Sequence, residues 1–123
     1  MTTRSLAVLV ATAAMAAFVG CSTGRSDVAQ RSFDNVSYTL AAGRTFDRAV
    51  AAAAVRRRWT PQTLDNGIYR CSLVQRDHRV VVDIVPAGPN AFSVKAVESN
   101  IPARKYNQWV DNLVREIVMH AAK

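Results

Sequence analysis

The chain has 123 residues, 50% of them hydrophobic, and a formal net charge of +7 at pH 7. This length suits one small domain and excludes two separate hydrophobic cores. The positive charge favours anionic partners such as phospholipid headgroups, lipopolysaccharide or nucleic acid, although a solvated basic surface is the plainer explanation.

An apolar run near the N-terminus indicates export. Residues 1–4 form a small positive region, and residues 6–19 are apolar, a length typical of a signal peptide and short of the ~20 residues that a membrane-spanning helix needs. The run ends in Phe18-Val19-Gly20-Cys21. This ending resembles the lipobox of bacterial lipoproteins, with Phe18 in place of the usual leucine, so we expect residues 1–20 to be a lipoprotein signal peptide.

The resemblance implies a covalent modification at Cys21. In such precursors the cysteine thiol receives a diacylglycerol, the chain is cut just before that cysteine, and the new amine is acylated, typically with palmitate. Two or more acyl chains anchor a protein stably without a membrane-spanning helix. The alternatives are an ordinary cleaved signal, with Cys21 as a bystander, or an uncleaved anchor.

The resemblance also implies a location in the cell envelope. Ser22 follows the cysteine where an aspartate would mark retention in the inner membrane. By similarity to enterobacterial lipoprotein sorting, this serine implies the outer membrane, with the domain facing the periplasm. Export makes nucleic acid the least favoured of the anionic partners.

The next residues are polar and lack any periodicity, so residues 21–32 are predicted to be a lipidated flexible tether. A single domain is predicted for residues 33–123. It begins with a short extended piece at residues 33–40. A lipidated Cys21 leaves Cys71 as the remaining thiol, which excludes an intrachain disulfide and leaves packing to hold the fold.

The first helix is predicted from Thr45 to Arg57, because apolar residues recur there at spacings of three and four. Those apolar residues are Phe46, Ala49, Val50, Ala53 and Ala54. Arg57 falls on their side of the helix. The helix should end near Arg56, because Thr60 precedes Pro61 and is pushed toward an extended conformation.

Three segments alternate apolar and polar residues, which predicts strands at 68–75, 79–85 and 91–98. The residues expected to face the core are Tyr69, Cys71, Leu73, Val80, Val82, Ile84, Phe92, Val94 and Ala96. Turn residues at 76–78 and 86–90 predict hairpins, so consecutive strands should pair antiparallel. Residues 59–64 are a possible fourth strand, before a turn at Asp65-Asn66-Gly67.

The last helix follows from apolar residues at helical spacing between Tyr106 and Ala121. Ser99 or Asn100 is expected to cap it, and Pro102 fits its first turn. The predicted fold is therefore α+β, with a three- or four-stranded antiparallel meander between two helices. Both helices should cover one sheet face.

Candidate reactive residues are few. Asp77 and His78 lie near Cys71 in sequence, but Cys71 should point into the core and His78 should lie at a hairpin tip, so a Cys-His-Asp arrangement is disfavoured. His78 and His120 lack the spacing of metal ligands, and no metal or cofactor is expected. We expect no enzymatic activity.

Two surfaces are candidates for binding. Trp59, Tyr106 and Trp109 could line a ligand groove, although aromatic residues at helical spacing more often belong to the core. The second surface is the open face of the sheet, where Arg70, Arg79 and Lys95 would stand among valines. We predict this face as a possible interaction surface for an envelope protein or an anionic lipid, against the plainer alternative of a half-solvated sheet.

The sequence also carries a resemblance over most of the predicted domain. A lipobox, an alanine-rich helix, a run of strands and the segment Tyr-Asn-Gln-Trp-Val-Asp-Asn-Leu at residues 106–113 resemble a family of small uncharacterised bacterial lipoproteins. This resemblance implies the fold but no activity. The expected function is a non-catalytic envelope binding or assembly accessory; the alternatives are a binder of anionic lipid or lipopolysaccharide, or a small periplasmic hydrolase.

Overall fold

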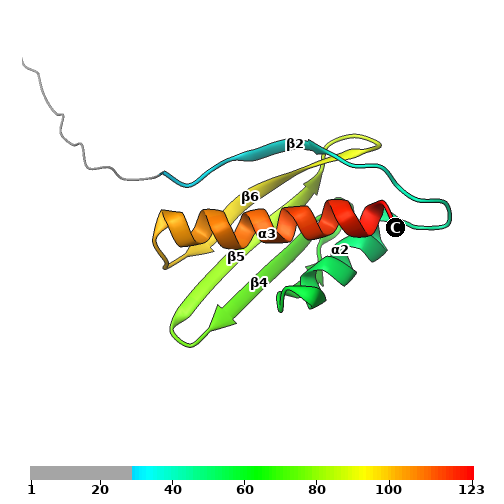
Figure 1. The fold of residues 1–123 in the computed structure, drawn as a ribbon. Coiled ribbons are helices and arrows are strands. Elements are labelled where there is room, and N and C mark those ends of the chain that lie inside the picture. The colour runs from blue at the N-terminus through cyan, green and yellow to red at the C-terminus, as the bar shows by residue number, and fades with distance from the viewer. Residues whose placement is uncertain (1–28) are drawn as a thin grey trace, which may run out of the picture.

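The computed structural model describes residues 29–123, which form an α+β fold with two helices and a five-stranded antiparallel sheet (Figure 1). The predicted signal peptide and Cys21 lie outside the described residues. The sheet order is β2-β6-β5-β4-β3. The elements are β2 (Phe33–Ser37), α2 (Phe46–Arg56), β3 (Thr60–Thr63), the short 3-10 turn η3 (Asp65–Gly67), β4 (Tyr69–Gln75), β5 (His78–Pro86), β6 (Ala91–Ser99) and α3 (Ala103–Ala121).

The three central strands and their consecutive antiparallel pairing are confirmed. Residues 60–63 form the possible fourth strand, and the turn before β4 contains Asn66 and Gly67 at positive φ. The predicted strand number was too low, because β2 adds a fifth strand beside β6. Its register shifts between Phe33 and Val36, so this short segment carries too little regular alternation to reveal its pairing partner.

The prediction was wrong for one residue that was expected to face the core. Ala96 is exposed, although the alternating pattern placed it with the buried Phe92 and Val94. Val82 pairs with Ala96 and Val81 with Glu98, so β6 contains one more residue than β5 at this point. Ala96 thus lies opposite the buried Val82, immediately before the bulge, where the regular alternation of β6 ends.

The first helix matches its predicted bounds to within one residue. Thr45 caps α2, because its side-chain oxygen accepts a hydrogen bond from the backbone N–H of Arg48 at 3.3 Å. After the helix ends, Arg58 adopts φ 69°, and the N–H of Trp59 donates to the carbonyl of Ala54 at 2.7 Å. This tight turn directs Trp59 back toward the core, where it is 3% exposed.

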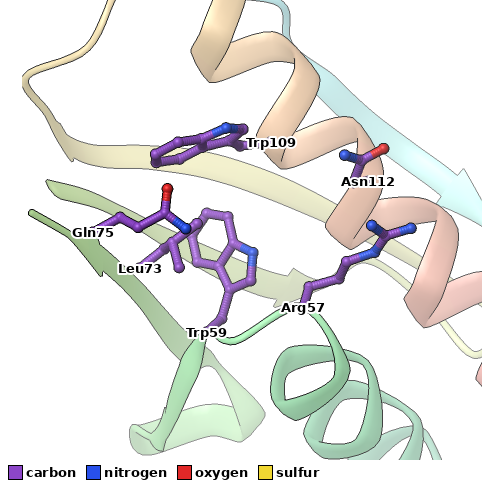
Figure 2. Close-up of a pocket in the computed structure, with 6 residues that line it drawn as sticks. All are labelled: Arg57, Trp59, Leu73, Gln75, Trp109 and Asn112. Atoms are coloured by element: carbon purple, nitrogen blue, oxygen red, sulfur yellow. The ribbon is translucent and has the colours of Figure 1, made fainter. Parts of the chain in front are cut away.

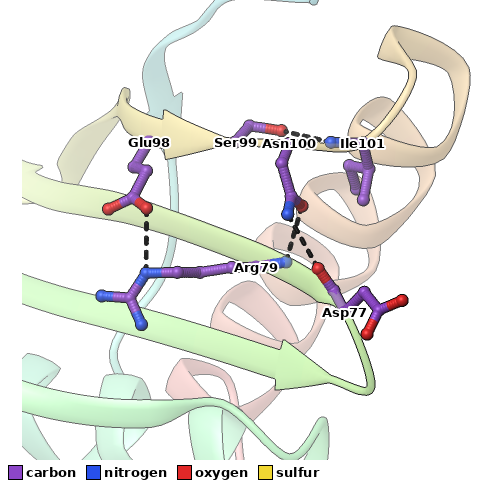
Figure 3. Close-up of polar contacts among 6 residues, drawn as sticks. All are labelled: Asp77, Arg79, Glu98, Ser99, Asn100 and Ile101. Atoms are coloured by element: carbon purple, nitrogen blue, oxygen red, sulfur yellow. Dashed lines mark hydrogen bonds and ion pairs between the residues drawn. The ribbon is translucent and has the colours of Figure 1, made fainter.

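The predicted cap of the last helix was wrong. Pro102 occupies the capping position of α3 and no side chain caps it. Asn100 instead accepts a hydrogen bond from the N–H of Arg79 at 2.8 Å and donates one to the carbonyl of Asp77 at 2.7 Å (Figure 3). Its amide therefore fastens the end of β6 to the turn between β4 and β5, and these two hydrogen bonds use the amide that the prediction had assigned to the helix cap.

A single core joins the elements. Buried residues of both helices and of the strands form one cluster, and the helices contact each other. Figure 1 shows α3 crossing in front of the strands, with α2 beside it. Of the predicted inward set, the residues other than Ala96 are buried.

The segment before β2 is also held in place. Asn107 on α3 is 8% exposed; its Oδ1 accepts from the N–H of Arg31 at 2.7 Å, and its Nδ2 donates to the carbonyl of Ala29 at 3.0 Å. Residues 29–31 were expected in the tether. The part of the chain held against the domain thus begins before Phe33.

Candidate functional site: a pocket between the helices and β4

A pocket of about 130 Å³ opens where the end of α2, the start of β3, β4 and α3 meet (Figure 2). It is lined by Arg57, Trp59, Leu73, Gln75, Trp109 and Asn112. Small-molecule sites commonly have volumes of roughly 300–1,000 Å³, so this pocket suits a single ring or one side chain of a larger partner.

The two indoles form opposing parts of the wall, as Figure 2 shows. Trp59 is set by the turn after α2 and is almost fully buried. Trp109 is half-buried on α3. The ring centroids of His78 and Trp109 lie 6.2 Å apart, in an edge-to-face arrangement. Lys105 Nζ lies 5.9 Å from the Trp109 ring centroid, within range of a cation–π contact.

The rest of the lining is polar. Gln75 and Asn112 each offer an amide with donors and an acceptor, and Arg57 adds a guanidinium. Apolar faces beside a few polar groups can both bury a ring and fix its orientation. The structure thus brings Trp59 and Trp109 together at one site and places Tyr106, 2% exposed, in the core instead.

A charged cluster lies beside the pocket. Arg57 Nη2 is 3.3 Å from Glu116 Oε2, and His120 Nε2 is 3.2 Å from Glu116 Oε1 without hydrogen-bond geometry. The Glu116 side chain is 7% exposed and that of Arg57 is 43% exposed. This ion pair explains why Arg57 occupies the apolar side of its helix. The sequence contained one indication of this ion pair. Each helix carries a charged residue on its apolar side: Arg57 at the end of the first, and Glu116, near His120, on the second.

The predicted interaction face is less basic than its cations suggested. Arg70 makes two hydrogen bonds to Asp83, at 2.8 and 3.0 Å, and Arg79 makes one to Glu98 at 3.0 Å. Lys95 is exposed and lies opposite Asp83 in the register. Sequence reasoning counted the cations but missed their cross-strand anions, which the strand register alone brings opposite them.

Val81 lies on this same face. It is 3% exposed but does not belong to the core cluster. Its neighbours in the register are Ser72 and Glu98. The paired charged side chains therefore cover aliphatic surface here, which reduces what the face offers to a partner.

The residues of the disfavoured Cys-His-Asp arrangement stay apart. Cys71 pairs with Val82 and His78 with Gln75, which places them four residues apart along the hairpin, about 13 Å at the rise of a strand. Cys71 is fully buried, and burial, followed by the nearby Asp83 charge, raises the pKa of its thiol to about 12. A neutral, buried thiol is a poor nucleophile.

Within residues 29–123, no three side chains of the metal-ligating types gather at one place. In that same range, neither helix combines the length and hydropathy needed to cross a bilayer. No family model, curated protein or solved structure matches the chain. The case for function therefore depends on the residues themselves.

Proposed function

We propose that this protein is a lipid-anchored component of the bacterial cell envelope, attached through Cys21 and facing the periplasm from the outer membrane. The apolar run that ends in Phe18-Val19-Gly20-Cys21 carries this proposal. Ser22, which follows Cys21 in place of an aspartate, supports the outer membrane by similarity to enterobacterial lipoprotein sorting. A cysteine so placed would hold the domain close to the bilayer surface.

Replacing Cys21 with alanine tests the anchor. The variant is expected to lose incorporation of labelled palmitate and to shift from the membrane fraction, because its acceptor thiol is gone. Labelling and fractionation of cells that express the full chain measure both effects. The matched control is Cys71→Ala, which should keep its label. Undiminished labelling of Cys21→Ala would refute the assignment.

We propose further that the domain is a non-catalytic binding or assembly accessory, and that the pocket receives one side chain of an envelope protein. The pairing of two indoles with amide and guanidinium groups carries this step. The small pocket volume favours a side chain over a free ligand. The buried Cys71, with its raised pKa, weighs against the hydrolase alternative, for which Cys71→Ser would have to abolish turnover.

Trp109→Ala tests the pocket. Because aromatic anchors dominate binding energy, we expect recovery of a partner crosslinked in the native envelope to fall about 10- to 100-fold. The control is Met119→Ala on the same helix, where the side chain is 43% exposed and does not line the pocket. Equal recovery from both variants would exclude the pocket as the binding site.

The sheet face remains the second candidate for the same role. We propose that both helices cover one face of the sheet and leave the other for Arg70, Arg79 and Lys95. Arg70 and Arg79 form ion pairs, whereas Lys95 lies opposite Asp83 in the register and forms no ion pair within residues 29–123, so Lys95→Glu probes this face without breaking one. Loss of the crosslinked partner with Lys95→Glu, and its retention with Trp109→Ala, would move the binding site to the sheet.

A further inference from the structure

The place where the chain joins the domain is set by Asn107. This buried amide forms hydrogen bonds with the backbone of Ala29 and Arg31. The start of the described chain is therefore held beside the N-terminal half of α3. Figure 1 shows the beginning of this segment and the first turns of α3 at the same end of the molecule. The loop between β5 and β6 lies at the opposite end.

The distance from Ala29 to the proposed anchor is limited. Cys21 precedes Ala29 by eight positions, and a fully extended chain spans at most about 28 Å over that length. A domain of roughly 100 residues has a radius of gyration of about 13 Å. The end that contains Ala29 therefore stays within about one domain diameter of any bilayer that holds Cys21.

That end carries a set of exposed cations, Arg31, Arg104 and Lys105, which we call the basic end. Asn107 ties Arg31 to α3 next to Arg104 and Lys105. The first turn of α3 contains no acidic residue, and within residues 29–123 none of these three cations forms an ion pair. In this respect they differ from Arg70 and Arg79.

We propose that the basic end docks on the anionic surface of the bilayer that holds the lipid anchor, and so orients the domain on the membrane. The inference rests on the proposed anchoring at Cys21. Anionic lipid headgroups attract each nearby Lys or Arg with about 1 kcal/mol. Each such cation therefore raises the ratio of docked to undocked domain about fivefold. Three such cations would favour docking by a factor on the order of 100.

The test uses the full lipidated chain in vesicles that contain phosphatidylglycerol and a headgroup-attached quencher. A fluorophore is placed on Gln108→Cys, near the basic end, or on Ala87→Cys, in the β5–β6 loop; the buried Cys71 leaves the new thiol as the reactive one. We expect stronger quenching at position 108 than at position 87. The difference should vanish in phosphatidylcholine vesicles and at high salt.

The charge-neutral variant Arg31→Gln/Arg104→Gln/Lys105→Gln should lower the docked-to-undocked ratio on the order of 100-fold. The matched control neutralises three exposed cations elsewhere, Arg48→Gln/Arg56→Gln/Lys123→Gln, and should keep the difference. A thermal unfolding midpoint that does not fall in the first variant separates lost docking from lost folding.

Equal quenching at both positions in the lipidated protein would overturn the docking and leave the anchor intact. Stronger quenching from Val97→Cys on β6 than from position 108 would also overturn it, because the sheet would then face the membrane. Absence of lipid on the wild-type chain would remove both the anchor and the docking.

Discussion

Arg57→Ala is expected to lower the free energy of unfolding by about 2–4 kcal/mol, because it leaves the buried Glu116 carboxylate without its cation. The Arg57 and Glu116 atoms are 3.3 Å apart, and Glu116 is far less exposed than Arg57. The remaining neighbour, His120, lacks hydrogen-bond geometry with the carboxylate. Chemical denaturation of the two proteins measures the difference.

Two further variants make this result interpretable. Arg57→Ala combined with Glu116→Leu should recover part of the loss, because no unpaired buried charge remains. Arg115→Ala breaks an ion pair with Asp111 on the same helix, but Arg115 is 76% exposed, so about 0.5 kcal/mol or less is expected. A cost for Arg57→Ala no greater than that of Arg115→Ala would contradict a structural role for the buried pair.

Phe92→Ala is expected to cost about 3–5 kcal/mol, the usual penalty for removing a buried aromatic ring. Phe92 is fully buried on β6, and its ring lies 6.0 Å from that of Tyr38 and 5.6 Å from that of Phe46. These contacts join β6 to the segment after β2 and to the start of α2. The cavity left by alanine would therefore loosen three parts of the fold at once.

The control for Phe92→Ala is Val97→Ala on the same strand. Val97 is 44% exposed, so its truncation should change the free energy of unfolding by about 0.5 kcal/mol or less. Equal denaturation midpoints for Phe92→Ala and the wild-type protein would show that the aromatic cluster does not bind these elements together.

The two helices and the central strands could be predicted because each carries a local pattern. The helical spacing of Phe46, Ala49 and Val50 and the alternation through Tyr69, Cys71 and Leu73 depend on neighbours within a few residues, and the structure confirms both. The predicted range of the first helix began at Thr45, one residue early, because Thr45 caps the helix. The burial of Cys71 followed from its place in such an alternation.

The candidate sites needed long-range information. Strands β3 to β6 separate Trp59 from Trp109 in sequence, and no local pattern shows that the two residues line one pocket. The pairing of Arg70 with Asp83 depends on the register between β4 and β5, and Ala96 is exposed although it lies opposite the buried Val82 in the register. Charge counting on isolated strands therefore overstated the basic character of the sheet face.

The sequence by itself carries the motif on which the proposed anchor at Cys21 rests. It also determined the type and the buried side of the helices and central strands, because these follow from short-range patterns. Only the tertiary structure decided that Asn107 holds residues 29–31, that Asn100 fastens a hairpin and that Arg57 meets Glu116. A polar side chain can satisfy its hydrogen bonds with many partners. Which partner such a side chain bonds in the folded protein depends on how distant segments pack around it.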